Sequence, residues 1–427
     1  MIATLFIGCI VLLAIGVPVA FALGGGTLAA IVMHGGYPLI ALPKYLFSGI
    51  DVFALEAVPF FILTAELMTG GALSEVLLRF ASQFVGRFRG GLGHTNILAI
   101  TFFSGISGSA LADAAGPGAI MIRMMRKGGY HPEYAAALTA AVSILGPIIP
   151  PSISMIIYAL AYPEIDLVSL MLAGVVPGIL IAVSIAVINH VISVRRNYRG
   201  ISEVLSLRDY LRNTWRAIPA LLLPILILGG IASGAFTPTE ASVVAVFYAL
   251  FAGRVIYRSL EWRMLPGILS RSALMTAAVL IIVAMSGAFA WVLTVSRVPH
   301  QLSELIVSMH LSPLAFLFAV NVFLLAFGIF IEPLPGVVVL VPILAPIAHA
   351  LGVNDLQFAI LVIVNLTMGM ITPPVGGLLF VTSIVARVPL TKMVRELWPF
   401  MWAQIAVLAL LSLVPGLSSW LPAILHK

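Results

Sequence analysis

Long apolar runs separated by short polar connections fill the chain, and this pattern predicts membrane-spanning helices. A helix that crosses the hydrocarbon core needs about 20 mostly apolar residues. Two stretches, 93–126 and 311–349, are rich in glycine, proline and serine, which favours re-entrant hairpins that enter and leave on one side. The remaining apolar runs predict spans at 2–16, 18–34, 52–70, 131–161, 168–194, 217–234, 239–257, 272–296, 356–386 and 396–418. An all-α polytopic membrane protein is therefore expected.

Composition excludes a soluble fold. Hydrophobic residues make up 61% of the 427 residues and charged residues 9%, whereas a soluble domain carries about 25% charged residues. The N-terminus has neither a basic region nor a small-residue cleavage site, so we expect a first span rather than a signal peptide. Cys9 is the single cysteine, which excludes internal disulfides and cysteine–metal sites.

The basic residues indicate how the chain is oriented. With both hairpins re-entrant, 19 of the 22 lysines and arginines fall on one side, which the positive-inside rule assigns to the cytoplasm. Both termini then face out. The net charge of +6 thus reflects membrane orientation, and no nucleic-acid partner is expected. Segments 73–90 and 201–216 are amphipathic and are predicted to lie along the membrane surface, although a solvated connecting helix explains 201–216 equally well.

A proline-containing motif occurs twice in the sequence. GPIIPPS at 146–152 matches GMITPPV at 369–375, an offset of 223 residues. The same offset pairs Gly105 with Gly328 and Gly129 with Gly352, and LSEVL at 73–77 resembles LSELI at 302–306. Several matches in one order indicate two homologous halves. The first half has three crossings, so the second begins on the opposite side and the repeats are expected to be inverted.

The repeat defines the expected domain organisation. Each half contains one hairpin and one broken helix, and a basic segment with two linker helices separates the halves. The expected parts are N-terminal scaffold helices at 1–51, a first repeat at 52–194 (hairpin 93–126, broken helix 131–161), the linker at 195–271, a second repeat at 272–418 (hairpin 311–349, broken helix 356–386) and a tail at 419–427.

Each motif interrupts a span that should otherwise be a continuous helix. Proline lacks the N–H that an interior helical residue donates, and it pushes the preceding residue out of helical geometry. The carbonyls around 146–151 therefore lose their helical partners, which is costly in hydrocarbon. A bound Na⁺ would replace those bonds, and the N-termini of the half-helices favour an anion. The alternative is a simple proline kink whose carbonyls are satisfied by neighbouring groups.

The tip of each hairpin carries one acid. FFSGISGSALADAAGPG at 102–118 contains Asp113, and FGIFIEPLPG at 327–336 contains Glu332. Charge inside a membrane is costly and is usually functional. The alternatives are an acid that hydrogen-bonds a hairpin turn and an acid that stays protonated.

Four segments together carry a resemblance to a known family. They are SGISGSALADAAGPGAIMIRMM, AALTAAVSILGPIIPPSI, GAFTPTEASVVAVFYAL and NLTMGMITPPVGGLLF. The chain resembles, over nearly its whole length, the large membrane subunit of tripartite ATP-independent periplasmic (TRAP) transporters. The resemblance implies a Na⁺-driven symporter of the bacterial inner membrane with the ion-transporter superfamily fold, in which a transport domain moves like an elevator against a scaffold. It also implies two partners, a small membrane (Q) subunit from another chain and a periplasmic (P) substrate-binding protein that delivers an organic anion, typically a carboxylate or sulfonate.

The resemblance also implies site residues and two or more coupling Na⁺ ions. The residues expected at one Na⁺ site are Ser104, Ser107, Gly146, Ile149 and Pro151, and those at the second are Gly328, Gly369, Thr372 and Val375. Phe327 and Phe330 stand where the repeat would place the two serines, so the second site does not copy those hydroxyls. The residues expected to line the substrate site are Ser109, Asp113, Ser152, Glu332 and Pro335. Arg123 is the nearest basic residue for a carboxylate, although a positive-inside anchor explains it better.

Three other functions compete with a symporter. GISG at 105–108 and AHALG at 348–352 resemble segments of rhomboid proteases, an assignment that requires Ser107 and His349 to be within hydrogen-bond reach. An anion channel would also line its path with carbonyls, but channels usually place several subunits around one pore. A primary pump is disfavoured because the sequence contains no G-x-x-x-x-G-K-[ST] phosphate loop. The chain is therefore expected to be a transporter and not an enzyme.

Overall fold

The computed structural model describes residues 1–35, 37–69, 73–200, 206–298, 301, 304, 311–329, 331–373 and 376–425. Within these ranges the regular elements are all helical. Six described helices are long and apolar enough to span a membrane: α11 (Leu167–Arg195), α12 (Leu207–Ala232), α13 (Pro238–Phe251, continued by a π-helical turn to Ile256), α14 (Leu265–Val295), α17 (Pro333–Ala350) and α20 (Leu390–Leu413). Shorter apolar helices are α1 (Ile2–Ala14), α2 (Val19–His34), α16 (Pro313–Gly328), α18 (Asp355–Gly369), α19 (Gly377–Ala386) and α21 (Gly416–Leu425). The expected all-α polytopic architecture is confirmed.

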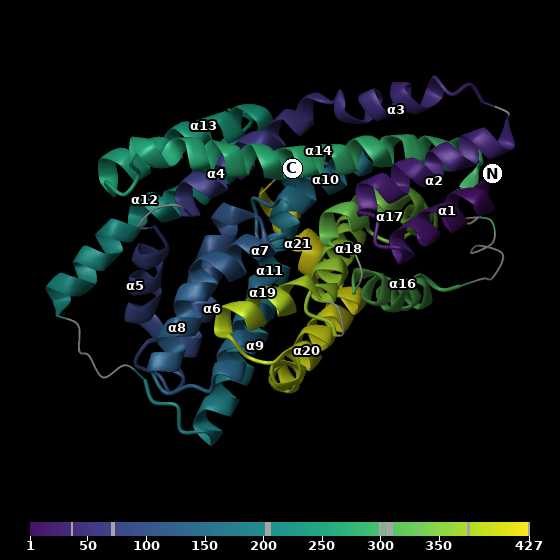
Figure 1. Cartoon of the computed structure of the whole chain (residues 1–427). Helices are drawn as coiled ribbons and strands as arrows, with labels where there is room; N and C mark the ends of the chain where they lie inside the picture. Colours follow the sequence, from purple (N-terminus) through teal and green to yellow (C-terminus); the bar gives the residue numbers. More distant parts are fainter. Residues whose placement is uncertain are drawn as a thin grey trace.

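The long helix α14 runs along one side of the molecule (Figure 1). It packs against α2, α3 (Ala41–Ile50) and α4 (Ala57–Thr69), and α4 also packs against α13. Glycines let α3 approach α14 closely, because a Cβ built on Gly287 would stand 2.9 Å from the Tyr45 carbonyl oxygen. The Tyr45 ring stacks on Trp291 with centroids 4.6 Å apart. The sequence pattern did not predict α3, which is short and contains Pro43 and Lys44.

The first predicted hairpin is present as two limbs that contact each other. α6 (Gly91–Ser107) is the entering limb, and α7 (Ala110–Asp113), a π-helical turn (Ala114–Gly118) and α8 (Ala119–Lys127) form the returning limb. α6 ends at Gly108, whose φ of 60° is left-handed and is readily adopted by glycine. Ser109 then begins α7 as its N-cap by accepting a hydrogen bond from the Ala112 N–H. The second hairpin consists of α16 and α17.

Both predicted helix breaks are confirmed. α9 (Pro132–Ser143) and α10 (Ile153–Ala161) are separated by non-helical residues 144–152. Between α18 and α19 the described residues, 370–373 and 376, are also non-helical. Ser152 starts α10 as its N-cap, with its hydroxyl oxygen accepting from the Met155 N–H. Helix starts follow the sequence offset, since α18 begins 223 residues after α9 and α20 begins 223 residues after α11.

The hairpins and broken helices contact one another in a crossed pattern. α6 and α8 of the first hairpin pack against α9, and α16 and α17 of the second pack against α18. The second half of each broken helix packs against the opposite repeat. α10 packs against α17 of the second hairpin, and α19 packs against α9 and the π-helical turn of the first hairpin. The two breaks therefore lie beside the two hairpin tips.

The linker differs from its predicted form. Segment 201–216 was expected to be a separate surface helix, but the structure makes Leu207–Ala232 one continuous α12, capped at its start by Ser206. Pro219 and Pro224 lie inside this helix without ending it, because neighbouring groups in a helical bundle can satisfy the freed carbonyls. The amphipathic helix predicted at 73–90 is present as α5 (Leu73–Val85). Residues 201–205, and LSELI at 302–306 except for Glu304, lie outside the described residues.

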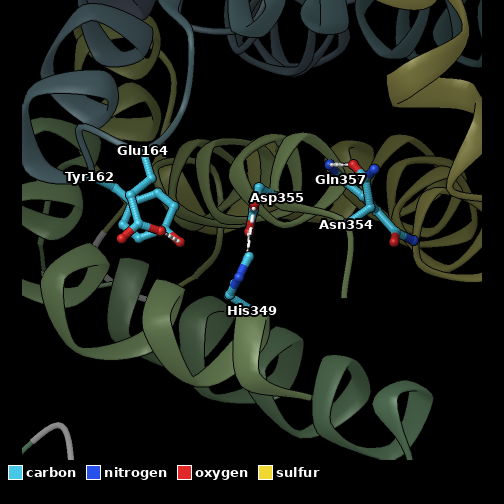
Figure 2. A network of polar contacts seen from close by, with 6 residues as sticks. All are labelled: Tyr162, Glu164, His349, Asn354, Asp355 and Gln357. Carbon is cyan, nitrogen blue, oxygen red and sulfur yellow. Dashed lines mark hydrogen bonds and ion pairs between the residues drawn. The ribbon is translucent and has the colours of Figure 1, made fainter. Parts of the chain in front are cut away.

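Alanine at Asn354 is expected to destabilise the fold without a direct effect on transport. The Asn354 Oδ1 atom accepts a hydrogen bond from the Gln357 N–H at 3.0 Å and so caps α18 (Figure 2). Loss of such a cap typically costs about 1 kcal/mol. Asn354→Ala should therefore lower the thermal unfolding temperature of the purified protein, whereas Asn354→Asp, which retains the acceptor, should not. Equal unfolding temperatures for the wild type and the alanine variant would contradict the capping role.

Candidate functional site

A cavity of about 210 Å³ lies between the two hairpin tips. The first tip contributes residues 107–112 and the second contributes residues 332–335. Helices α4 and α14 form the opposite wall, and both breaks reach the cavity through Pro147 and Met370. The remaining lining residues are Ile62, Ala65, Glu66, Ile153, Ser154, Met275, Ala278, Val279 and Ile282.

Beside this cavity, the two predicted serines both bind one buried carboxylate. Ser104 Oγ donates to Asp113 Oδ2 at 2.6 Å, and Ser107 Oγ donates to Asp113 Oδ1. Ser104 and Asp113 are fully buried, and Ser107 is 2% exposed. The left-handed turn at Gly108 folds the returning limb back so that the three side chains meet. Each hydroxyl keeps lone pairs, so the cluster offers hydroxyl and carboxylate oxygens in one place.

The first hairpin tip touches the first helix break. A Cβ built on Gly146 would stand 2.6 Å from the Ser109 carbonyl carbon and 2.9 Å from Asp113 Oδ2. A Cβ on Gly108 would stand 3.1 Å from the Pro151 carbonyl oxygen. Only glycine at both positions allows this approach, so the break carbonyls lie next to the Asp113 cluster.

Six carbonyls in the first break receive no hydrogen bond from the part of the chain that the structure describes. They belong to Ile144, Gly146, Ile148, Ile149, Pro150 and Pro151. Three of them, Gly146, Ile149 and Pro151, are residues predicted to bind Na⁺, mainly through their carbonyls. The Pro147 carbonyl, in contrast, accepts from Ser152 Oγ at 2.6 Å. These carbonyl oxygens lack hydrogen-bond donors within the described residues and lie beside a carboxylate and two hydroxyls. Together they form a group of oxygen ligands that fits a hard cation.

The second tip and break also meet through glycine. A Cβ on Gly328 would stand 3.1 Å from the Cα of Gly369. The carbonyls of Gly369 and Thr372 already accept the N–H groups of Thr372 and Gly376, and Thr372 Oγ1 donates to the Met368 carbonyl at 2.9 Å. Each of these two carbonyls retains a second lone pair, but both accept a hydrogen bond that the carbonyls of Gly146, Ile149 and Pro151 lack in the described chain. Val375 and Phe330 lie outside the described residues.

The structure separates the predicted substrate residues into two groups. Ser109, Glu332 and Pro335 line the cavity, together with Ser107. Asp113 and Ser152 do not line it, because Asp113 is held by the two serines and Ser152 is buried as the cap of α10. A Cβ on Gly377 would be 4.0 Å from Glu332 Oε1, so Glu332 lies near the start of α19.

Two charged residues at the cavity, Glu66 and Arg271, were not among the predicted site residues. Glu66 and Glu332 are the charged residues among those that line it, and both are acids. Arg123 is exposed on α8 and is not among the lining residues. Arg271 on α14 instead forms an ion pair with Glu66, with 2.8 Å between Nε and Oε2. The two residues are 205 positions apart, and no local pattern links them.

The protease geometry is absent from the described structure. Ser107 shares the cavity with Pro335 at the start of α17, whereas His349 is 14 residues further along, about 21 Å at the rise of an α-helix. His349 is exposed and is directed at Asp355, with 3.1 Å between Nδ1 and Oδ1 (Figure 2). Ser107 donates instead to Asp113. Ser107 and His349 therefore do not form a nucleophile–base pair.

An all-helical membrane protein with interrupted helices around an internal cavity has the architecture of a membrane transporter. The family model described as "Tripartite ATP-independent periplasmic transporter, DctM component" matches residues 6–417. The chain belongs to this family of transporter permeases, which is not an enzyme family.

Two relatives agree with this membership, and a solved structure shares the fold. The sialic acid TRAP transporter large permease protein SiaM of Vibrio cholerae is 38% identical over 422 residues, covering 99% of this chain and 98% of the relative. The C4-dicarboxylate TRAP transporter large permease protein DctM of Pseudomonas aeruginosa is 38% identical over 377 residues, 88% of each chain. The crystal structure of the YdaH transporter of Alcanivorax borkumensis has a TM-score of 0.66 at 14% identity, covers 88% of each chain, and supports the fold alone.

Proposed function

We propose that this chain is the membrane permease of a Na⁺-coupled symporter that imports an organic anion. Family membership supports transport. The single observation that supports Na⁺ coupling is the group of carbonyls in the first break, Gly146, Ile149 and Pro151 among them, that have no hydrogen-bond donor in the described chain and lie beside the Asp113 cluster. The cavity between the hairpin tips is the proposed substrate site.

The first Na⁺ site uses the three named break carbonyls with the hydroxyls of Ser104 and Ser107. Asp113 supplies the negative charge that balances the ion and orients both hydroxyls. The second site uses Gly328, Gly369, Thr372 and Val375. Ser109, Glu332 and Pro335 contact the anion. Binding of cations at both breaks offsets the negative charge of a cavity lined by two acids and an incoming anion.

The movement is an elevator in which hairpins and broken helices slide together against α4, α13 and α14. The 223-residue offset of helix starts and the crossed packing of the two hairpins support an inverted repeat. Close contacts at glycine residues hold each hairpin tip against the neighbouring helix break. This packing supports movement of the hairpins and broken helices as one unit. Inverted repeats with discontinuous helices are a recurrent design of secondary transporters.

The chain works in the bacterial inner membrane with two partners, and its termini face the periplasm. A small membrane subunit comes from another chain, and a periplasmic binding protein delivers the anion. The names of relatives support a carboxylate such as sialic acid or a C4-dicarboxylate, or a sulfonate such as isethionate.

The experiment is uptake into proteoliposomes that contain the chain and both partners, with N-acetylneuraminate, succinate and isethionate as labelled substrates. One of these anions should accumulate in a saturable manner when Na⁺ is high outside, and accumulation should stop when choline replaces Na⁺. Uptake that is non-saturable and independent of Na⁺ would favour an anion channel and contradict the proposal.

A further inference from the structure

The cavity between the hairpin tips ends at an interhelical ion pair. Glu66 of α4 lines the cavity, and its Oε2 atom lies 2.8 Å from Nε of Arg271 on α14. The Arg271 side chain is 56% exposed and that of Glu66 is 20% exposed. The guanidinium is thus held by a residue of the cavity wall but remains accessible.

Helical spacing places Arg271 on the cavity face of α14. Met275, Ala278 and Ile282 line the cavity, and they follow Arg271 by four, seven and eleven residues. Residues at this spacing share one face of an α-helix. Arg271 therefore lies one turn beyond the cavity wall, at the N-terminal end of α14.

The ion pair occupies only one edge of the guanidinium. Its hydrogen bond within the described residues is made by Nε, and Nη1 lies beside Gly267, one turn earlier in α14. The N–H groups of both terminal nitrogens therefore have no hydrogen-bond partner in the described chain. An arginine fork with two free terminal nitrogens matches the geometry of a carboxylate or sulfonate. The charged residues that line the cavity are acids, so Arg271 supplies a positive charge next to the cavity wall that can attract an anion.

We propose that Arg271, positioned by Glu66, binds the carboxylate or sulfonate group of the transported anion at the cytoplasmic end of the cavity. The side is assigned by the basic residues Arg254, Arg258 and Arg263, which directly precede α14. The inference rests on the proposed function, whose substrate it concerns. The anion passes from the hairpin tips to Arg271 on its way into the cell, and Glu66 holds the guanidinium beside the end of the cavity.

The alternative is a purely structural ion pair that holds α4 to α14. Arg196 and Glu396 provide a matched control, because they form a similar interhelical pair (2.9 Å between Nη2 and Oε2) away from the cavity. A structural role requires only opposite charges on the two helices. Anion binding requires a positive charge at 271.

The first measurement is the concentration dependence of exchange from inside proteoliposomes loaded with N-acetylneuraminate, succinate or isethionate. Arg271→Gln should raise the internal KM at least about tenfold, Arg271→Lys should raise it less, and Arg196→Gln should leave it unchanged. The charge swap Glu66→Arg with Arg271→Glu should not restore the KM. Restoration by the swap, or an unchanged internal KM in Arg271→Gln, would overturn the proposal.

The second measurement is calorimetric titration of the purified chain with the same three anions, which needs no transport. Wild-type protein should bind one of them, and Arg271→Gln should weaken that affinity at least about tenfold. If binding depends on Arg271 but no Na⁺-driven uptake occurs, the anion site stands and the proposed symport fails. If uptake is Na⁺-driven but affinity is unaffected by Arg271→Gln, the anion site alone is refuted. Absence of binding by all three anions would also refute it.

Discussion

Alanine at Gly146 is expected to abolish anion uptake in a protein that still inserts into the membrane. The added methyl group would stand 2.6 Å from the Ser109 carbonyl carbon and 2.7 Å from the Ala110 backbone nitrogen. Backbone atoms of the hairpin cannot rotate away as a flexible side chain would, so the tip must move off the break. That movement separates the break carbonyls from the Asp113 cluster. Uptake should fall at least about a hundredfold, measured as initial rate in proteoliposomes at equal protein content.

A matched glycine tests whether the effect is specific. Gly229 lies in α12, and a Cβ there meets no atom within 4 Å. Gly229→Ala should therefore retain wild-type uptake. Gly369→Ala, which drives a methyl group into the Gly328 backbone at the second tip, should lose uptake as Gly146→Ala does. Wild-type rates in Gly146→Ala would show that close contact between tip and break is unnecessary.

Asparagine at Asp113 is expected to raise the Na⁺ concentration needed for half-maximal uptake at least about tenfold, equivalent to about 1.4 kcal/mol of Na⁺ binding. The substitution keeps the size of the side chain but removes the negative charge beside the break carbonyls. Ser104 and Ser107 lose the carboxylate acceptor that orients them. The measurement is the initial uptake rate as a function of Na⁺ at saturating substrate.

The control for this prediction is Asp209→Asn. Asp209 pairs with Arg212 in α12 and is not among the residues that line the cavity. The Na⁺ dependence of uptake by the Asp209→Asn variant should match that of the wild type. If Asp113→Asn has the same Na⁺ dependence as the wild type, Asp113 does not balance a bound cation and serves only to hold the hairpin turn.

The sequence predicted the helices and their breaks because both depend on local chemistry. A long apolar run indicates a span. The prolines at 147, 150 and 151 remove three backbone donors within five residues, whereas the isolated prolines at 219 and 224 leave α12 continuous. Prediction failed in the linker, since the amphipathic character of 201–216 does not reveal whether the helix ends before the apolar run that follows. It missed α3, whose short sequence carries no long apolar run.

The site was predictable only where its residues are close in sequence. Ser104, Ser107 and Asp113 lie within one hairpin, so the sequence showed an acid close to residues with small hydroxyl side chains. The hydrogen bonds from both serines to Asp113 depend on the left-handed turn at Gly108, which the structure was needed to show. Ser152 was expected in the substrate site but caps α10, a role its position before a helix equally allows. The pair of Glu66 and Arg271 joins helices from distant parts of the chain, which no sequence periodicity connects.

The most direct test measures the entry of radioactive sodium and of the labelled anion in the same proteoliposomes, with both partners present and the membrane potential clamped. Symport through two cation sites predicts that anion addition drives Na⁺ entry, with two or more Na⁺ ions per anion, and that Asp113→Asn lowers this ratio or stops both fluxes. Anion accumulation without any Na⁺ entry would contradict it.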